Sequence, residues 1–113
     1  MDIYFKTRKL QKLCSKESLA TKELGAKSAR KLQQRLMELY AADTLDDISK
    51  LPPARCHELK GNRKGQLAVD LAEGLRLVFI PATNPAPTKE AGGLDWRKVT
   101  EIEIIAIENY HRK

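Results

Sequence analysis

The stretch from Arg55 to Ile80, RCHELKGNRKGQLAVDLAEGLRLVFI, decides the fold of this chain of 113 residues. We predict three short strands in antiparallel succession here, because turn-forming segments interrupt the stretch twice. The first is the basic turn between Gly61 and Gly65, and the second is the hairpin at Ala72-Glu73-Gly74. Glycine and asparagine tolerate the backbone angles that such tight turns require.

Apolar and polar residues alternate along the two later strands, which predicts that one face of the sheet is buried. The apolar side chains are Leu67, Val69, Leu71, Leu75, Leu77 and Phe79, and the opposite face carries Gln66, Ala68, Asp70, Arg76, Val78 and Ile80. Arg76 is therefore a single cation inside an otherwise apolar strand. This position makes Arg76 the first candidate for a functional residue.

The segment before this stretch is predicted to be mainly helical. A short strand at 2–6 precedes a short helix that Thr7 can cap, and Ser18 can cap a long helix that ends near Ala42. The apolar stripe of the long helix is Ala29, Leu32, Leu36, Leu39 and Tyr40, and its solvated remainder is Lys27, Arg30, Lys31, Arg35 and Glu38. Thr44 to Asp47 resembles a capping box that opens one more helical turn.

The segment after this stretch is predicted to be a long exposed loop followed by a strand. Prolines and glycines dominate 81–98, and Trp96 is expected to pack back onto the sheet edge. The strand is expected at 99–107. Strict alternation would place Ile102, Ile104 and Ala106 on one face and Ile105 and Ile107 on the other.

These elements predict a single domain, 1–113, of the α+β class. Two N-terminal helices would pack on one face of a twisted, mostly antiparallel sheet of four to five strands. The other face would carry Arg76 and its neighbours.

The composition limits the possible partners and cofactors. Lys and Arg number 21 against 15 Asp and Glu, giving a net charge of +6, which suits either a polyanionic partner or a merely basic surface. No leader and no long apolar run is present, which predicts a cytoplasmic protein without a membrane partner. Cys14 and Cys56 lack metal-ligand spacing, so no metal and no cofactor is expected.

Six side chains besides Arg76 could carry chemistry, each with a structural alternative. Arg76 could clamp a phosphate or form an ion pair with Glu101, Glu103 or Glu108, and the residues alone favour neither. Histidine is the side chain type that titrates near neutral pH, so His57 and His111 could act as base or acid, or each could be structural. The basic turn could follow a nucleic-acid backbone or simply be solvated, and its candidates are Lys60, Arg63 and Lys64. Tyr110 could stack on a base or lie at the sheet edge. Cys56 and His57 cannot form a dyad, because neighbours on a strand point to opposite faces.

Three segments carry a resemblance to a known family. HELKGNRKGQ from His57 to Gln66, LRLVF around Arg76 and the terminal Tyr110-His111 resemble the HigB branch of the RelE/ParE toxin superfamily. The resemblance implies the toxin of a type II toxin–antitoxin system, which binds the ribosome, cleaves mRNA in the A site and is neutralised by a cognate antitoxin, a helix-turn-helix DNA-binding protein. The working residues would be His57, Lys60, Arg63, Arg76, Tyr110 and His111, with Asn109 where relatives often have an acid.

The implied reaction is attack of the RNA 2′-hydroxyl on the adjacent phosphate. Such a reaction needs a base, a cation and an acid but no metal, so the residues above would suffice. Two alternatives remain: a non-catalytic toxin of the same fold that binds DNA gyrase, and a catalytically weak module that binds RNA or the ribosome.

Overall fold

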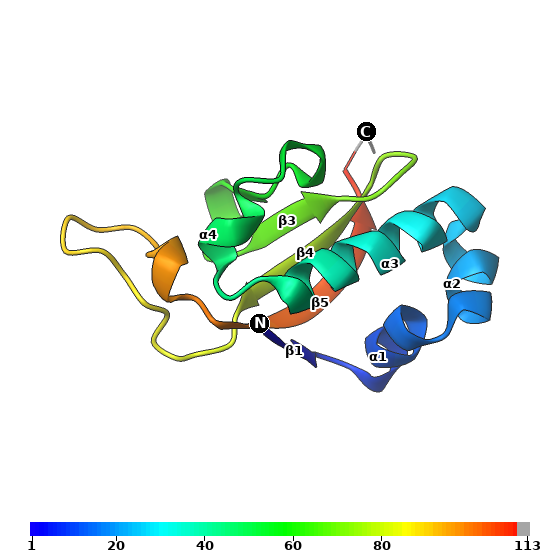
Figure 1. Ribbon diagram of the computed structural model, residues 1–113, viewed down its shortest axis with the longest axis horizontal. Coiled ribbons are helices and arrows are strands. Elements are labelled where there is room, and N and C mark those ends of the chain that lie inside the picture. Colours follow the sequence, from blue (N-terminus) through cyan, green and yellow to red (C-terminus); the bar gives the residue numbers. More distant parts are fainter. Residues whose placement is uncertain (111–113) are drawn as a thin grey trace.

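A mixed sheet of five strands forms one layer of the protein (Figure 1), in the computed structural model that describes residues 1–110. The strands are β1 (Asp2–Phe5), β2 (His57–Glu58), β3 (Leu67–Asp70), β4 (Leu75–Pro81) and β5 (Glu101–Asn109). Their order across the sheet is β1-β5-β4-β3-β2. β1 pairs with β5 in parallel, and the other neighbours are antiparallel. The three predicted strands between Arg55 and Ile80 are therefore confirmed.

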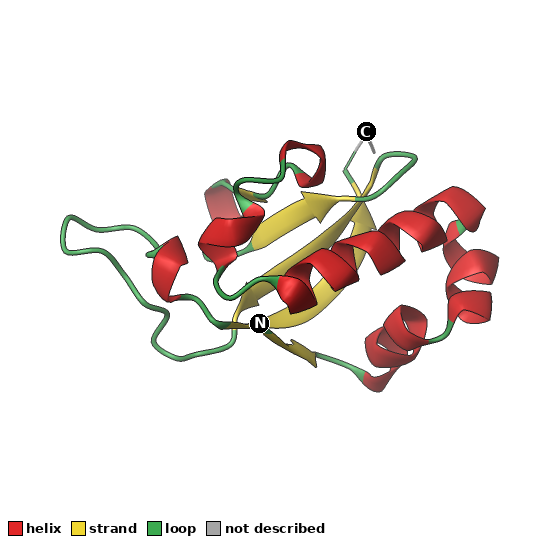
Figure 2. Cartoon of the chain, viewed as in Figure 1, coloured by secondary structure: helices red, strands yellow, loops and turns green. Residues whose placement is uncertain are grey.

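Helices form the second layer, and α3 crosses in front of the sheet in Figure 2. They are α1 (Arg8–Ser15), α2 (Glu17–Leu24), α3 (Ala26–Ala41) and α4 (Leu45–Ile48). Buried side chains of the helices and of one sheet face form a single hydrophobic core. The predicted α+β class is confirmed.

The predicted long helix from Ser18 is two helices, because Gly25 separates them. Gly25 has φ of +87°, a positive value that glycine adopts without strain, which ends α2 and lets the chain turn before α3. α2 also begins before Ser18, which lies inside the helix and does not cap it. The prediction of two N-terminal helices was therefore wrong in number: three helices precede α4.

Arg35 is the largest departure from the predicted helix surface. Its side chain is only 3% exposed, although the sequence pattern placed it in solvent. Its Nε donates to Asp70 O at 2.7 Å, its Nη2 donates to Pro53 O at 2.8 Å, and its Nη1 pairs with Glu38 at 3.1 Å. Arg35 thus ties α3 to β3 and to the turn before β2. Conversely, Tyr40 was expected in the apolar stripe but is 54% exposed.

A β-bulge in β5 changes which face its residues occupy. Val78 pairs with Ala106 and Phe79 with Ile104, so Ile105 is the extra residue. Ile104 therefore faces the core, whereas Ala106 shares the opposite face with Val78, and the prediction that Ala106 lies beside Ile104 was wrong. The bulge also moves Glu108 to the face of Arg76, with which it pairs in the register.

The segment between β4 and β5 follows the prediction of a long loop. A short 3-10 helix, Trp96–Lys98, precedes β5, and the Trp96 indole donates to Glu58 Oε2 at 2.9 Å on the edge strand β2. The predicted packing of Trp96 is therefore confirmed.

The Asp47 carboxylate accepts from the backbone N–H of Thr44 at 3.4 Å, as expected of a capping box. Within 1–110, every helix is too short or too polar to cross a membrane.

Candidate functional site

The sheet face that the helices do not cover, here called the open face, carries the candidate site. Cross-strand partners share a face, so the register assigns two rows of residues to it. One row is His57, Ala68, Val78 and Ala106, and the other is Asp70, Arg76 and Glu108. Ala68 and Val78 are fully buried although no helix covers them, which indicates that longer side chains lie over this part of the sheet.

Glu108 accepts hydrogen bonds from two arginines at once. Nε and Nη2 of Arg76 donate to Oε2 at 3.2 and 2.8 Å. Nη1 and Nη2 of Arg63 donate to the same carboxylate at 3.1 and 2.8 Å. Arg63 belongs to the 3-10 turn Gly61–Arg63 after β2, so its side chain spans β3 and β4 to reach β5. The two guanidinium groups are therefore held side by side over the open face.

Tyr110 and Arg55 complete this group of side chains. The Tyr110 ring lies 5.3 Å from Arg76 Cζ and 5.8 Å from Arg55 Cζ, within range of a cation–π interaction. Arg55 also forms a two-pronged pair with Asp70, at 2.7 and 3.2 Å. We call Arg55, Arg63, Arg76, Asp70, Glu108 and Tyr110 the arginine cluster. It contains three cations and two carboxylates, so it keeps a net positive charge.

The arginines of the cluster also change the ionisation of Glu108. Hydrogen bonds from Arg63, and then from Arg76, lower the pKa of Glu108 although partial burial acts against them. Glu108 is therefore a carboxylate at neutral pH and keeps both arginines charged and oriented. A guanidinium has two edges, and Glu108 uses the Nε–Nη2 edge of Arg76. The other edge of the Arg76 guanidinium, which carries Nη1, is directed away from Glu108 and can meet another anion.

His57 lies on the open face in the row next to the cluster. Its Nδ1 is 2.8 Å from Arg55 O. A carbonyl oxygen only accepts, so Nδ1 carries the proton and Nε2 is the nitrogen able to take a second one. Cys56 points to the other face and packs against the core, where burial raises its pKa to about 12. The structure thus keeps Cys56 and His57 apart, as the strand alternation predicted.

Within residues 1–110, the other residues that the sequence predicted to be functional do not belong to the arginine cluster. Lys60 and Lys64 are exposed on the basic turn and do not enter the cluster, whereas Arg63 does. Asn109 pairs with Leu75, so it lies on the strand face opposite to Glu108. His111 lies outside the described residues.

Three residues of this surface were not singled out from the sequence as functional. Asp70 and Gln66 belong to the predicted polar face of β3, which was a usable signal. Arg55 gave no such signal, because it reaches Asp70 from a left-handed backbone conformation with φ of 48° after the Pro52–Ala54 turn. Glu108 was expected only as one of three possible partners of Arg76, and the bulge in β5 selects it.

Neither protein-family models nor curated proteins give a match to this chain. The structural support for a function is therefore the geometry of the open face itself.

Proposed function

We propose that this chain is a ribosome-dependent endoribonuclease of the HigB type, the toxin of a type II toxin–antitoxin system that cleaves mRNA in the ribosomal A site. The observation that carries the proposal is the position of Arg76. Glu108 binds one edge of the Arg76 guanidinium, and the Tyr110 ring lies against its face. The edge directed away from Glu108 can receive a phosphate. The resemblance of three segments to HigB toxins supports the same function.

The proposed reaction uses the 2′-hydroxyl of the RNA as its nucleophile. That oxygen bonds to the adjacent phosphorus and the P–O5′ bond breaks, leaving a 2′,3′-cyclic phosphate and a 5′-hydroxyl. Nε2 of His57 would take the proton of the 2′-hydroxyl, because Nδ1 is already bound to Arg55 O. Arg76, supported by Arg63, would stabilise the negative charge that develops on the phosphate. The proton for the 5′-oxygen would come from Tyr110 or His111.

The flanking groups fit RNA as a substrate. Lys60 and Lys64 on the exposed turn would contact backbone phosphates. Tyr110 would stack against a base or hold Arg76 in place. The ribosome would supply the message in the required conformation, because the site offers few acids and bases of its own.

A translation assay with mapping of message ends tests the proposal. Purified protein is added to programmed ribosomes, and new 5′ ends are expected within the codon in the A site. Efficient cleavage of naked RNA would contradict ribosome dependence. Inhibition of DNA supercoiling without message cleavage would identify the gyrase-binding alternative, and ribosome binding without new ends would identify the weak binding module.

The cognate antitoxin is the second proposed partner. A small helix-turn-helix DNA-binding protein encoded beside this chain is expected to form a stable complex with it and to restore translation in the same assay. Failure of such a neighbour to bind would argue against the toxin–antitoxin assignment, whatever the outcome of the cleavage assay.

A further inference from the structure

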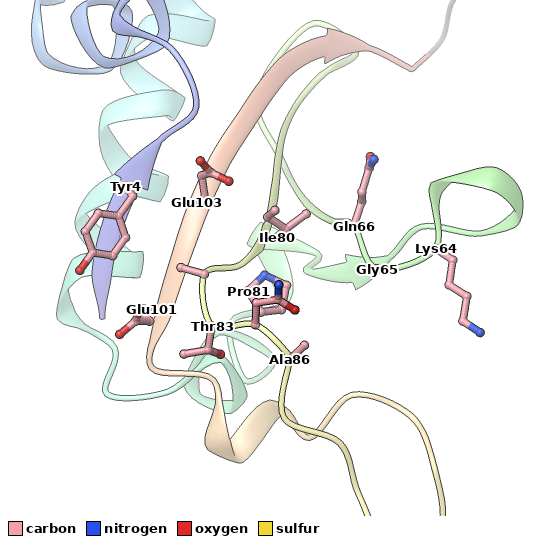
Figure 3. Close-up of a pocket in the computed structure, with 12 residues that line it drawn as sticks. Tyr4, Lys64, Gly65, Gln66, Ile80, Pro81, Thr83, Ala86, Glu101 and Glu103 are labelled. Carbon is pink, nitrogen blue, oxygen red and sulfur yellow. The ribbon is translucent and has the colours of Figure 1, made fainter.

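The open face contains a second feature beyond the arginine cluster, a broad depression of about 820 Å³. Residues at four neighbouring positions line it in one row across the sheet, as Figure 3 shows: Tyr4 of β1, Glu103 of β5, Ile80 of β4 and Gln66 just before β3. Ile80 is four residues from Arg76 along β4, about 13 Å away. The depression is therefore a neighbouring site and not part of the cluster.

The depression offers a flat aromatic surface. The Tyr4 ring is 51% exposed on the open face, and Ile80 and Pro81 supply apolar contact nearby. An exposed tyrosine on a sheet is a common stacking platform for a nucleotide base. The shape and lining thus suit a planar ring.

The charge of the depression is opposite to that of the cluster. Glu101 and Glu103 line it, and neither has an ion-pair partner among residues 1–110, whereas Glu108 and Asp70 in the cluster are paired. Two carboxylates repel a phosphate but accept hydrogen bonds from N–H donors. The depression therefore suits a base edge that donates hydrogen bonds, and not the RNA backbone.

Guanine matches this requirement better than the other bases. Its Watson–Crick edge has two adjacent donors, N1–H and the N2 amino group, which fit the two oxygens of one carboxylate. Adenine and cytosine place a ring nitrogen that only accepts beside their amino group, and uracil has one N–H between two carbonyl oxygens. A carboxylate at this position would therefore favour guanine.

The depression and the cluster are connected. The Gln66 side chain lines the depression and accepts from Arg63 Nε at 2.7 Å, and Arg63 in turn pairs with Glu108. Lys64 lies on the far side of the depression in Figure 3, where it can contact a backbone phosphate. A single RNA strand could thus cross from one site to the other.

We infer that this depression binds a guanine base of the RNA that flanks the cleaved bond, with Tyr4 stacking on the ring and Glu103 accepting from N1–H and the N2 amino group. The inference rests on the proposed function, because it takes RNA to be the ligand. It adds a specificity site that the cleavage chemistry itself does not require.

Binding of uncleavable oligonucleotides tests the inference without a ribosome. Fluorescein-labelled 2′-O-methyl AAGAA and AAIAA differ only in the N2 amino group, which inosine lacks. At low ionic strength we expect AAGAA to bind about tenfold more tightly in fluorescence anisotropy. Glu103→Gln should remove this preference by weakening AAGAA more than AAIAA, because inosine retains only the N1–H donor, and Glu90→Gln, in the exposed loop, should leave it unchanged. Tyr4→Ala should weaken both oligonucleotides about tenfold, and Tyr4→Phe should not.

Several results would overturn the inference. They are equal affinity for AAGAA and AAIAA, a guanine preference that survives Glu103→Gln, no binding of either oligonucleotide, or binding of a lysine-rich peptide that Glu103→Gln abolishes in the absence of any guanine preference. The two proposals fail separately. Message cleavage on ribosomes without a guanine preference refutes only the guanine site, whereas guanine binding without message cleavage refutes only the endoribonuclease.

Discussion

Arg76 on β4 and Glu108 on β5 form an ion pair at 2.8 Å on the open face of the sheet. The Arg76 side chain is 15% exposed and the Glu108 side chain 28%. The pair is therefore partly shielded from water, and a second arginine, Arg63, shares the carboxylate at 2.8 Å. A structural role and a phosphate-binding role of Arg76 are thus compatible, because the ion pair with Glu108 occupies only one edge of the Arg76 guanidinium.

Arg76→Ala should reduce message cleavage far more than it reduces stability. Loss of a cation that stabilises the transition state is expected to lower the single-turnover rate on programmed ribosomes by about 10²–10³. Glu108 keeps its bond to Arg63 in this variant, so the free energy of unfolding should fall by only about 1–2 kcal/mol. Arg97→Ala, in the exposed 3-10 helix before β5, is the control and should change neither quantity. A large loss of stability with unchanged cleavage per folded molecule would show that Arg76 is only structural.

Glu108→Gln should weaken the acid sensitivity of folding. The pKa of Glu108 is lower in the folded protein than its ordinary value, so the carboxylate stabilises the fold above about pH 4.3. This stabilisation is lost as the pH falls through the folded pKa. Urea unfolding at about pH 7 and about pH 3 should therefore show a smaller decrease in the free energy of unfolding for Glu108→Gln than for the wild type. An equal decrease in both proteins would mean that the arginines do not bind Glu108 in solution.

Tyr110 should act through its ring on Arg76 and Arg55. Tyr110→Phe keeps an aromatic face beneath both guanidinium groups, whereas Tyr110→Leu removes an interaction of about 0.5–1 kcal/mol for each exposed pair. We expect Tyr110→Leu to cleave more slowly and to have a lower thermal midpoint than Tyr110→Phe, which keeps the ring and loses only the hydroxyl. If cleavage by Tyr110→Phe is also slow, the hydroxyl takes part in the reaction, for example by protonating the 5′-oxygen.

Arg35→Ala should be among the most destabilising substitutions on the helices. It leaves the carbonyl groups of Asp70 and Pro53 without their donor and creates a cavity under α3. Removing one partner of a buried charged network is expected to lower the free energy of unfolding by about 3–5 kcal/mol. Arg30→Ala, five residues earlier on the exposed side of α3, should change it by less than about 0.5 kcal/mol. Similar values for the two variants in urea unfolding would contradict the buried position of Arg35.

Local patterns in the sequence determined the strands and the side on which Arg76 lies. Alternation in β3 and β4 depends only on the period of an extended chain, so it predicted that Asp70 and Arg76 share the open face. The turns at Gly61 and at Ala72-Glu73-Gly74 follow from the backbone angles that these residues tolerate. Each of these properties is local, and for that reason the sequence was sufficient.

Tertiary structure decided which residues complete the arginine cluster. Strict alternation would have placed Glu108 on the core face with Ile102 and Ile104, and the bulge at Ile105 reverses this assignment. A bulge depends on how two strands pair, which the pattern of one strand does not contain. Arg35 was likewise indistinguishable from its solvated neighbours on the helix, because its partners are backbone carbonyls of distant segments. The polar pairs across the sheet arise from long-range contacts, and only the folded chain brings their members together.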